Sequence, residues 1–268
     1  AVMLCSVFAS TAAAATKCAC GHSPVVMISG FGATVLAEKQ EDGSLKRVFP
    51  PDTKEILKLL GVNAPDLITG IIKLIAQKGT DGIEKPMREI ITSIVEPLRM
   101  NDDGTSFYDI VPILSSAKDT SLEAFTKNDQ LDLVPYTGSE FLDMEVIGDE
   151  IGDDHVFNFL YDWRLSHADV AAQLHDYLAE VCALTGHDKV SVYSISQGCL
   201  LLGVYMYEYP NDNYIDRAVF DTPLLAGSNL VSDLYTDKPI SLNFDTTLDI
   251  LRSILHTEAD FSFVMDII

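Results

Sequence analysis

The clearest pattern of hydrophobic and polar positions lies in the stretch KVSVYSISQGCLLLGVYMYEYP, residues 189–210. β-Branched and aromatic residues alternate with small polar ones up to Tyr193, which is typical of a buried strand. Good helix formers follow from Gln197 onward. Very few residues are left between them to reverse the chain. The pattern therefore predicts a strand and a helix joined by a tight turn, with Ser196 at its tip.

Regular alternation of helices and strands surrounds this turn. We expect helices at about 139–151, 167–184 and 197–209, and strands at 155–160, 189–193 and 215–221. The helix at 167–184 has Ser166 as its N-cap, Asp169 three residues later and Gly186 as its stop. Strands separated by helices of this length predict parallel pairing with right-handed connections. The predicted fold class is therefore α/β, with a mostly parallel sheet.

The first half of the chain has a different organisation. A short strand at 25–28 leads into a glycine-rich turn around Phe31. From about 52 to 99 the patterns are helical and no convincing strand separates them, and MNDDGTSFYDIVPI then returns to turn and extended structure. This favours a helical insertion at about 52–135 over further βαβ units. We expect residues 16–228 to form a partial core that carries this insertion, and residues 229–268 to begin a helical cap or lid.

The first fifteen residues, AVMLCSVFASTAAAA, are an apolar run that ends in small residues. This pattern is typical of a secretory signal peptide before its cleavage site, and the alternative is a buried N-terminal helix. The run is too short to span a bilayer, and no other stretch of the sequence is long enough. We therefore expect a secreted or extracytoplasmic protein with no transmembrane segment.

Charge narrows the range of partners. The chain has 18 Lys and Arg against 40 Asp and Glu, a formal net charge of -22. Such a molecule repels nucleic acids and anionic bilayers at long range. The acidic residues are spread along the chain, as on a solvated acidic surface. We expect no nucleic-acid partner.

The cysteines leave several alternatives open. Cys5 would leave with the signal peptide, whereas Cys18 and Cys20, in KCACGH, could pair or anchor the N-terminus. Cys182 and Cys199 flank the central strand, where either is compatible with a small buried hydrophobic residue. No dense disulfide framework is indicated. No metal-ligand spacing is visible, so we expect no metal and no cofactor.

The spacing Ser194-x-Ser196-x-Gly198 departs from the G-x-S-x-G pattern only at its first small residue. In that pattern the central serine occupies a strained strand-to-helix turn, and bulky flanking residues would collide with the neighbouring strand and helix. The turn lifts the hydroxyl above the carboxyl end of the sheet, where open α/β sheets bind ligands. Ser196 is therefore the candidate nucleophile, and the alternative is an ordinary turn serine.

Acyl transfer also requires hydrogen-bond donors for the negative charge that develops on the carbonyl oxygen. The backbone N–H of Gln197, directly after the serine, is one candidate. The loop after the early strand supplies the other, which we assign to Phe31. Removing one such donor would cost about 3–4 kcal/mol of transition-state stabilisation. Phe31 and Gln197 are therefore predicted to form the oxyanion hole.

A general base is harder to find. In α/β-hydrolases the carboxylate and the histidine follow the nucleophile in sequence. Only His256 does so, and its helical pattern with apolar neighbours favours a packing role. The earlier histidines lie at the edges of predicted strands and helices, where surface roles suffice. We expect the catalytic acid and histidine to lie beyond Ile268, and these 268 residues alone to have little activity.

Four blocks of sequence resemble the lecithin:cholesterol acyltransferase family. They are PVVMISGFGATVLAEK, NFLYDWRLS, KVSVYSISQGCLLL and DRAVFDTPLLAGS. The resemblance covers 24–37 and about 158–228, and YDWR after a strand is its most specific part. The chain departs from the family pattern at Ser194, at Ser29 where a proline is usual, and at 222–225. The resemblance implies an α/β-hydrolase fold, an acyl-serine intermediate and lipid esters as the expected substrates.

The YDWR block also has a structural interpretation. Asp162 and Arg164 are close enough in sequence to brace the loop, while Trp163 would fill the floor beneath the site. We favour this supporting role over direct catalysis, because neither charged group supplies the general base.

The sequence therefore predicts a serine acyl hydrolase or O-acyltransferase that acts on lipid esters, at a lipid interface in some settings. Both reactions share an acyl-enzyme, and they differ in whether water or an alcohol attacks it second. The alternative is a noncatalytic binding or surface protein that retains the hydrolase fold. A peptidase on the same fold is a third option.

Overall fold

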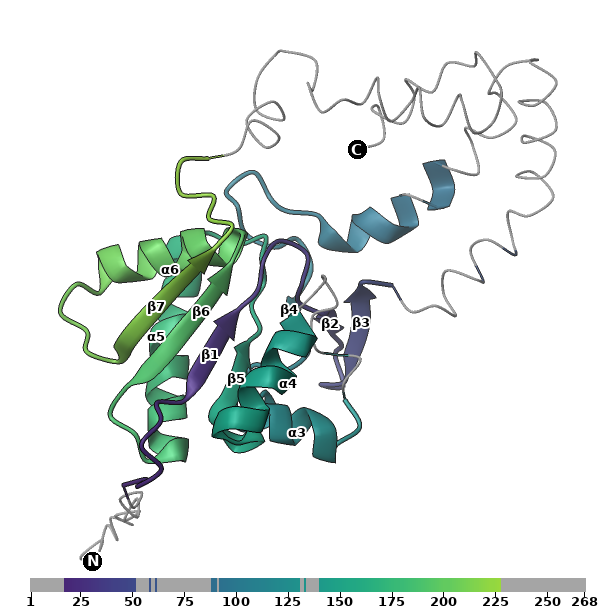
Figure 1. Ribbon diagram of the computed structural model, residues 1–268. Helices are drawn as coiled ribbons and strands as arrows, with labels where there is room; N and C mark the ends of the chain where they lie inside the picture. The colour runs from purple at the N-terminus through teal and green to yellow at the C-terminus, as the bar shows by residue number, and fades with distance from the viewer. Residues whose placement is uncertain are drawn as a thin grey trace, which may run out of the picture.

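The computed structural model describes residues 17–51, 58, 61, 88–90, 92–130, 133 and 140–227. These residues form an α/β structure in which helices cover both faces of a parallel sheet (Figure 1). The predicted fold class is thus confirmed at this level. The predicted signal peptide, most of the helical stretch at 52–78, and the cap at 229–268 lie outside the described residues.

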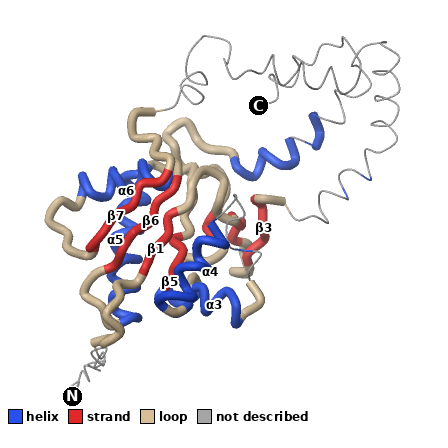
Figure 2. The backbone as a smooth tube through the Cα atoms, in the orientation of Figure 1, coloured by secondary structure: helices blue, strands red, loops and turns tan. Residues whose placement is uncertain are grey.

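The main sheet has the strand order β5-β1-β6-β7, and every neighbouring pair is parallel (Figure 2). Its strands are β1 (Val25–Ile28), β5 (Val156–Phe159), β6 (Val190–Ile195) and β7 (Ile215–Asp221). The predicted parallel pairing is confirmed. Because β6 runs to Ile195, Ser196 follows the strand directly. The order also places β1, which precedes the glycine-rich turn, beside the strand that ends at Ser196.

Two hydrophobic cores hold this sheet between its helices. The helices are α3 (Leu122–Lys127), α4 (Glu140–Ile151), α5 (His167–Thr185) and α6 (Gln197–Glu208). Along β1, Val26 and Ile28 face the core formed with α5 and α6, whereas Met27 faces the core formed with α3 and α4. This burial on both faces explains why β1, with the sequence VVMI, is a continuous apolar run.

Helix α5 begins and ends close to the residues that the sequence predicted, but only some of the expected capping interactions form. Ser166 occupies the N-cap position, yet its side chain makes no capping hydrogen bond, so the expected side-chain cap does not form. Asp169 still lies in the first turn, where a negative charge interacts favourably with the helix dipole. Gly186 ends the helix in the left-handed conformation, at φ 69°.

A second, antiparallel sheet was not predicted. It has the order β3-β2-β4 and consists of β2 (Leu36–Lys39), β3 (Leu45–Phe49) and β4 (Ile110–Pro112). Asp42 and Gly43 lie in the short connection between β2 and β3, and the Asp42 carboxylate accepts hydrogen bonds from Ser44. Within the described ranges, no helix is long and apolar enough to cross a membrane.

Candidate active site

Ser196 occupies a strained turn between β6 and α6. Its backbone has φ 53° and ψ -115°, a conformation that residues with a side chain rarely adopt. The turn is fixed on both sides: the N–H of Ser196 donates to the carbonyl of Asp221 at 3.0 Å, and the N–H of Cys199 donates to the carbonyl of Ser196 at 3.1 Å. Such strain costs on the order of 1–3 kcal/mol and persists only where the surrounding structure enforces it.

Two glycines allow the turn to pack against β1. A Cβ atom on Gly198 would lie 2.3 Å from the carbonyl oxygen of Ile28 and 2.8 Å from that of Ser29. A Cβ atom on Gly30 would lie 3.0 Å from the Cβ of Ser196 and 3.5 Å from its Oγ. The glycine-rich turn and the Ser196 turn are therefore in contact, and both depend on the absence of a side chain.

Ser194 takes the place of the usual first glycine by turning inward. Its side chain is fully buried, and its hydroxyl donates to the carbonyl of Val219 in β7 at 2.8 Å. The thiol of Cys199 donates to the carbonyls of Ser194 and Asp221, at 3.2 Å each. Burial raises the pKa of the Cys199 thiol. Neither Ser194 nor Cys199 is therefore suited to act as the nucleophile.

The two predicted oxyanion donors lie on the segments that meet at Ser196. Gln197 is the first residue of α6, so its N–H has no acceptor within the helix. Phe31 follows Gly30, and its side chain is 67% exposed. Within the described part of the chain, neither N–H donates a hydrogen bond to a carbonyl. Both therefore remain candidates for binding an external oxygen.

Asp162 and Arg164 form a buried ion pair below the turn. The backbone N–H and the Nε of Arg164 donate to Oδ1 of Asp162 at 3.1 and 2.9 Å, and its Nη2 donates to Oδ2 at 2.6 Å. The two side chains are only 2% and 5% exposed. Nη2 of Arg164 also donates to the hydroxyl of Ser106 at 3.0 Å. These contacts hold the shape of the loop rather than offering a charge to a substrate.

Trp163 connects this loop to the rest of the site. Its ring contacts those of Phe31 and Phe49, with centroid distances of 4.4 and 5.2 Å. Its carbonyl accepts a hydrogen bond from the side-chain amide of Gln197 at 3.0 Å. Phe49, from the unexpected second sheet, and the side chain of Gln197 are supporting groups that the sequence analysis did not identify.

Tyr161 fixes the chain where it leaves β1, and the sequence analysis gave it no separate role. Its hydroxyl donates to the carbonyl of Ser29 at 2.9 Å, and its N–H donates to the hydroxyl of Thr34 at 3.2 Å. The segment that contains Phe31 is therefore held between these two bonds. Its position in the YDWR block was the available signal.

The described residues do not complete a catalytic triad. Within them, no side chain hydrogen bonds to the hydroxyl of Ser196. His155 and His187 precede β5 and β6, at the opposite edge of the sheet, and His175 bonds to Asp212. His256 lies outside the described residues. Asp221 does stand at the same edge as Ser196, and its carboxylate accepts a hydrogen bond from Tyr193 at 2.7 Å.

Comparison with known proteins gives little further information. No family model matches the chain, and no curated protein matches it. Among solved structures, the chain is similar to one described as the crystal structure of a Tle4–Tli4 complex, with a TM-score of 0.34 and 13% identity. The match covers 76% of this chain and 46% of the other, so this chain spans less than half of that protein's length. A likeness at this level identifies neither a family nor a function.

Proposed function

We propose that the protein is a serine acyl hydrolase or O-acyltransferase of the α/β-hydrolase type, with Ser196 as its nucleophile. The observation that carries the proposal is the strained backbone of Ser196 at the end of β6, in contact with the glycine-rich turn after β1. Residues held in such a conformation cluster at active sites, where the strain is part of the mechanism. In a nucleophile turn of this type the strained backbone exposes the hydroxyl, and the N–H donors come from the following residue and from the loop after an early strand.

The geometry supports a two-step acyl transfer. Oγ of Ser196 attacks the ester carbonyl carbon and loses its proton to a base, while the N–H groups of Phe31 and Gln197 stabilise the negative oxygen. Collapse of this intermediate breaks the ester bond, and the leaving alcohol takes up a proton. Water or a second alcohol then attacks the acyl-serine and restores the hydroxyl. We expect the base to come from outside the described residues, because none of them hydrogen bonds to the Ser196 hydroxyl.

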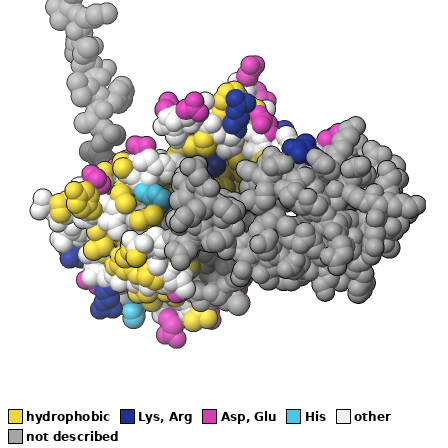
Figure 3. All heavy atoms as spheres, turned by 90° about the horizontal axis from the view of Figure 1, so that it is seen from above, with side chains coloured by type: hydrophobic (Ala, Val, Ile, Leu, Met, Phe, Trp, Pro, Cys, Tyr) yellow, Lys and Arg dark blue, Asp and Glu magenta, His cyan; other side chains and the backbone are white. Residues whose placement is uncertain are grey.

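The exposed side chains around this edge favour an apolar acyl group. Phe31 and Leu225 are exposed hydrophobic residues in segments that follow β1 and β7. Seen from above, hydrophobic side chains are exposed on the described part of this face (Figure 3). Together with the resemblance of the YDWR and elbow blocks to lipid acyltransferases, this favours lipid esters as substrates.

Covalent labelling tests the proposal directly. The full-length protein should react with a fluorophosphonate probe, and peptide mass spectrometry should find the label on Ser196. The variant S196A should lose the label. The variant S191A is the matched control, because Ser191 lies at the other end of the same strand and should leave labelling unchanged. Labelling that persists in S196A would move the nucleophile to another residue.

The rival function is a noncatalytic binding protein, favoured by the lack of a base among the described residues. Turnover of a p-nitrophenyl ester distinguishes the two functions. We expect the full-length protein to release p-nitrophenol and S196A to fall to the uncatalysed rate. A full-length protein that neither takes the label nor turns over the ester would support the noncatalytic function.

A further inference from the structure

Four potential metal ligands converge at the edge of the sheet opposite Ser196. Cys18 and Cys20 precede β1, His155 precedes β5 and His187 precedes β6. Because β5, β1 and β6 are adjacent and parallel, the residues just before them meet at one edge. The ligand atoms of all four residues lie within 4.8 Å of one another.

The distances within this Cys18–Cys20–His155–His187 cluster match a tetrahedral metal. Nε2 of His155 lies 3.7 Å from the sulfur of Cys18 and 3.7 Å from that of Cys20, and Nε2 of His187 lies 3.4 Å from the sulfur of Cys20. A tetrahedral zinc ion has bonds of about 2.3 Å to sulfur and about 2.0–2.1 Å to nitrogen, which separates the two ligand atoms by roughly 3.5 Å. The observed separations lie on either side of this value.

The contacts around the cluster also prepare it for a metal. Nδ1 of His155 lies 2.8 Å from the carboxylate of Asp154 and must donate to it, which leaves Nε2 with a lone pair directed at the cysteines. A carboxylate that orients a histidine in this way is a regular feature of metal sites. The N–H of Cys20 donates to the sulfur of Cys18 at 3.4 Å, so the two cysteines are held side by side. Both cysteines are free of disulfides.

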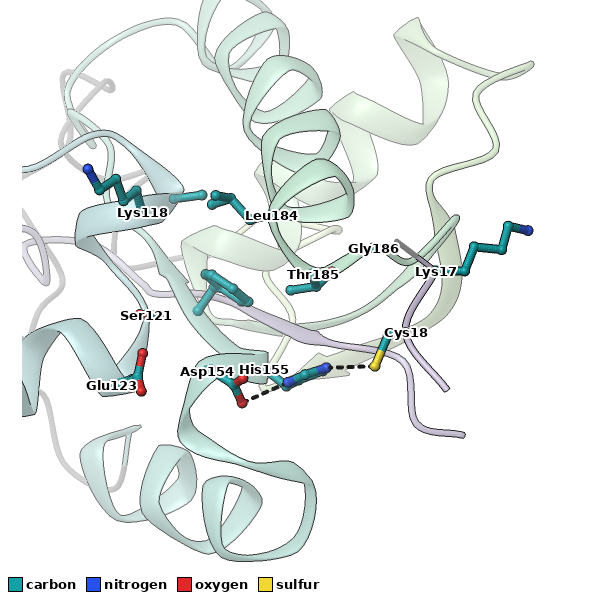
Figure 4. Close-up of a pocket in the computed structure, with 12 residues that line it drawn as sticks. Lys17, Cys18, Lys118, Ser121, Glu123, Asp154, His155, Leu184, Thr185 and Gly186 are labelled. Carbon is teal, nitrogen blue, oxygen red and sulfur yellow. Dashed lines mark hydrogen bonds and ion pairs between the residues drawn. The ribbon is translucent and has the colours of Figure 1, made fainter. Parts of the chain in front are cut away.

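The cluster is anchored and remains accessible. The N–H of Cys18 donates to the carbonyl of Gly186 at 3.1 Å, which ties the segment before β1 to the end of α5. The side chain of His155 is 11% exposed. Asp154, His155 and Cys18 line an open pocket of about 550 Å³, where Figure 4 shows them in a row joined by dashed lines. This pocket gives an ion a route of entry.

The geometry points to a structural zinc site formed by Cys18, Cys20, His155 and His187. Two thiolates and two imidazoles favour zinc, and four protein ligands leave no open position for catalysis. Binding converts two thiols and a hydrated Zn²⁺ into a neutral zinc–bis(thiolate) centre and releases two protons. The ion would fasten the chain before β1 to the starts of β5 and β6. The site does not depend on the function proposed for Ser196.

Metal analysis of the reduced full-length protein tests the inference. We expect about one zinc ion per chain after dialysis against Zn²⁺, and none after treatment with a chelator. Co²⁺ added to the metal-free protein should give intense visible bands of a tetrahedral site and a near-ultraviolet thiolate-to-cobalt band. Wild-type protein with reduced thiols that binds neither ion would overturn the inference, whatever the variants do.

Variants locate the site. C20S and H187N should each lose zinc in a competition with a chromophoric chelator, with circular dichroism verifying the fold. D154N should retain the ion with affinity reduced about 10–100-fold. C182A and H175Q are matched controls, since these residues lie outside the cluster, and both should bind zinc as the wild type does. Retention of full affinity by C20S and H187N would overturn the assignment.

Discussion

A serine held at φ 53° carries strain that a glycine would not. Replacing Ser196 by alanine keeps the Cβ atom and therefore the strain. Replacing it by glycine removes the strain, worth about 1–3 kcal/mol, against about 0.5–1 kcal/mol for the greater freedom of the unfolded chain. We expect S196G to be more stable than S196A by about 1 kcal/mol in urea unfolding, while both lose fluorophosphonate labelling. S196G less stable than S196A would show that the turn is not strained.

At the residue scale, the sequence predicted the structure correctly where the backbone tolerates only one type of residue. The motif requires a small residue at position 198. The structure shows why, because a Cβ atom on Gly198 would collide with the carbonyl oxygen of Ile28. Ser194 was harder to interpret. A buried hydroxyl is tolerated at this position because it donates to the carbonyl of Val219. The spacing of residues in the motif does not reveal a hydrogen-bond partner on the neighbouring strand.

At the scale of elements, Asp212 connects the two helices on one face of the sheet. Its carboxylate accepts hydrogen bonds from His175 in α5, at 2.7 Å, and from the hydroxyl of Tyr205 in α6. Burial acts to raise the pKa of Asp212, but the bonds from Tyr205 and His175 outweigh it and hold the pKa below its ordinary value of 3.8. The charged carboxylate therefore stabilises the folded state.

The sign of the pH dependence follows from this lowered pKa. The contribution of Asp212 is complete above its ordinary pKa and is lost as the pH falls through the lower folded value. D212N should cost about 1–2 kcal/mol of unfolding free energy at pH 7, and the difference from wild type should shrink at pH 3. Urea unfolding at both pH values measures it, with D216N at an exposed aspartate as the control. A difference that is the same at both pH values would contradict this account.

The clearest of the elements in the second half were predicted because α5 and β6 each follow one hydrophobic period. Strand β7 has the predicted bounds, and α6 begins at the predicted residue. The antiparallel sheet of β2, β3 and β4 was missed because its strands are short and partly exposed, so their hydrophobic pattern is weak. β4 pairs with β2, which lies more than sixty residues before it in the sequence, and pairing over that distance leaves no local signal.

At the scale of the whole molecule, the parallel sheet separates the two proposed sites. Its carboxyl edge carries Ser196, and its amino edge carries the Cys18–Cys20–His155–His187 cluster. The cluster was not predicted because its ligands are 135 and 167 residues apart in sequence. Each nevertheless precedes a predicted strand of one parallel sheet. The N-terminal ends of these parallel strands lie at the same end of the sheet. The position of each ligand just before a strand could therefore have indicated the cluster, although the sequence spacing between the ligands did not.

This separation predicts that metal removal will affect stability and leave the chemistry of Ser196 in place. Zinc at 100–1,000 times its dissociation constant stabilises a folded protein by about 3–4 kcal/mol, which for a chain of this size is on the order of 6–16 °C in melting temperature. We expect a chelator to lower the melting temperature of the full-length protein by that amount.

Fluorophosphonate labelling of Ser196, measured well below the melting transition, should change by less than about twofold, because no ligand of the ion contacts the turn. In the reverse direction, S196A should bind zinc with unchanged affinity. Loss of labelling on chelation, in protein whose circular dichroism is unaltered, would show that the two edges are coupled through the strands between them.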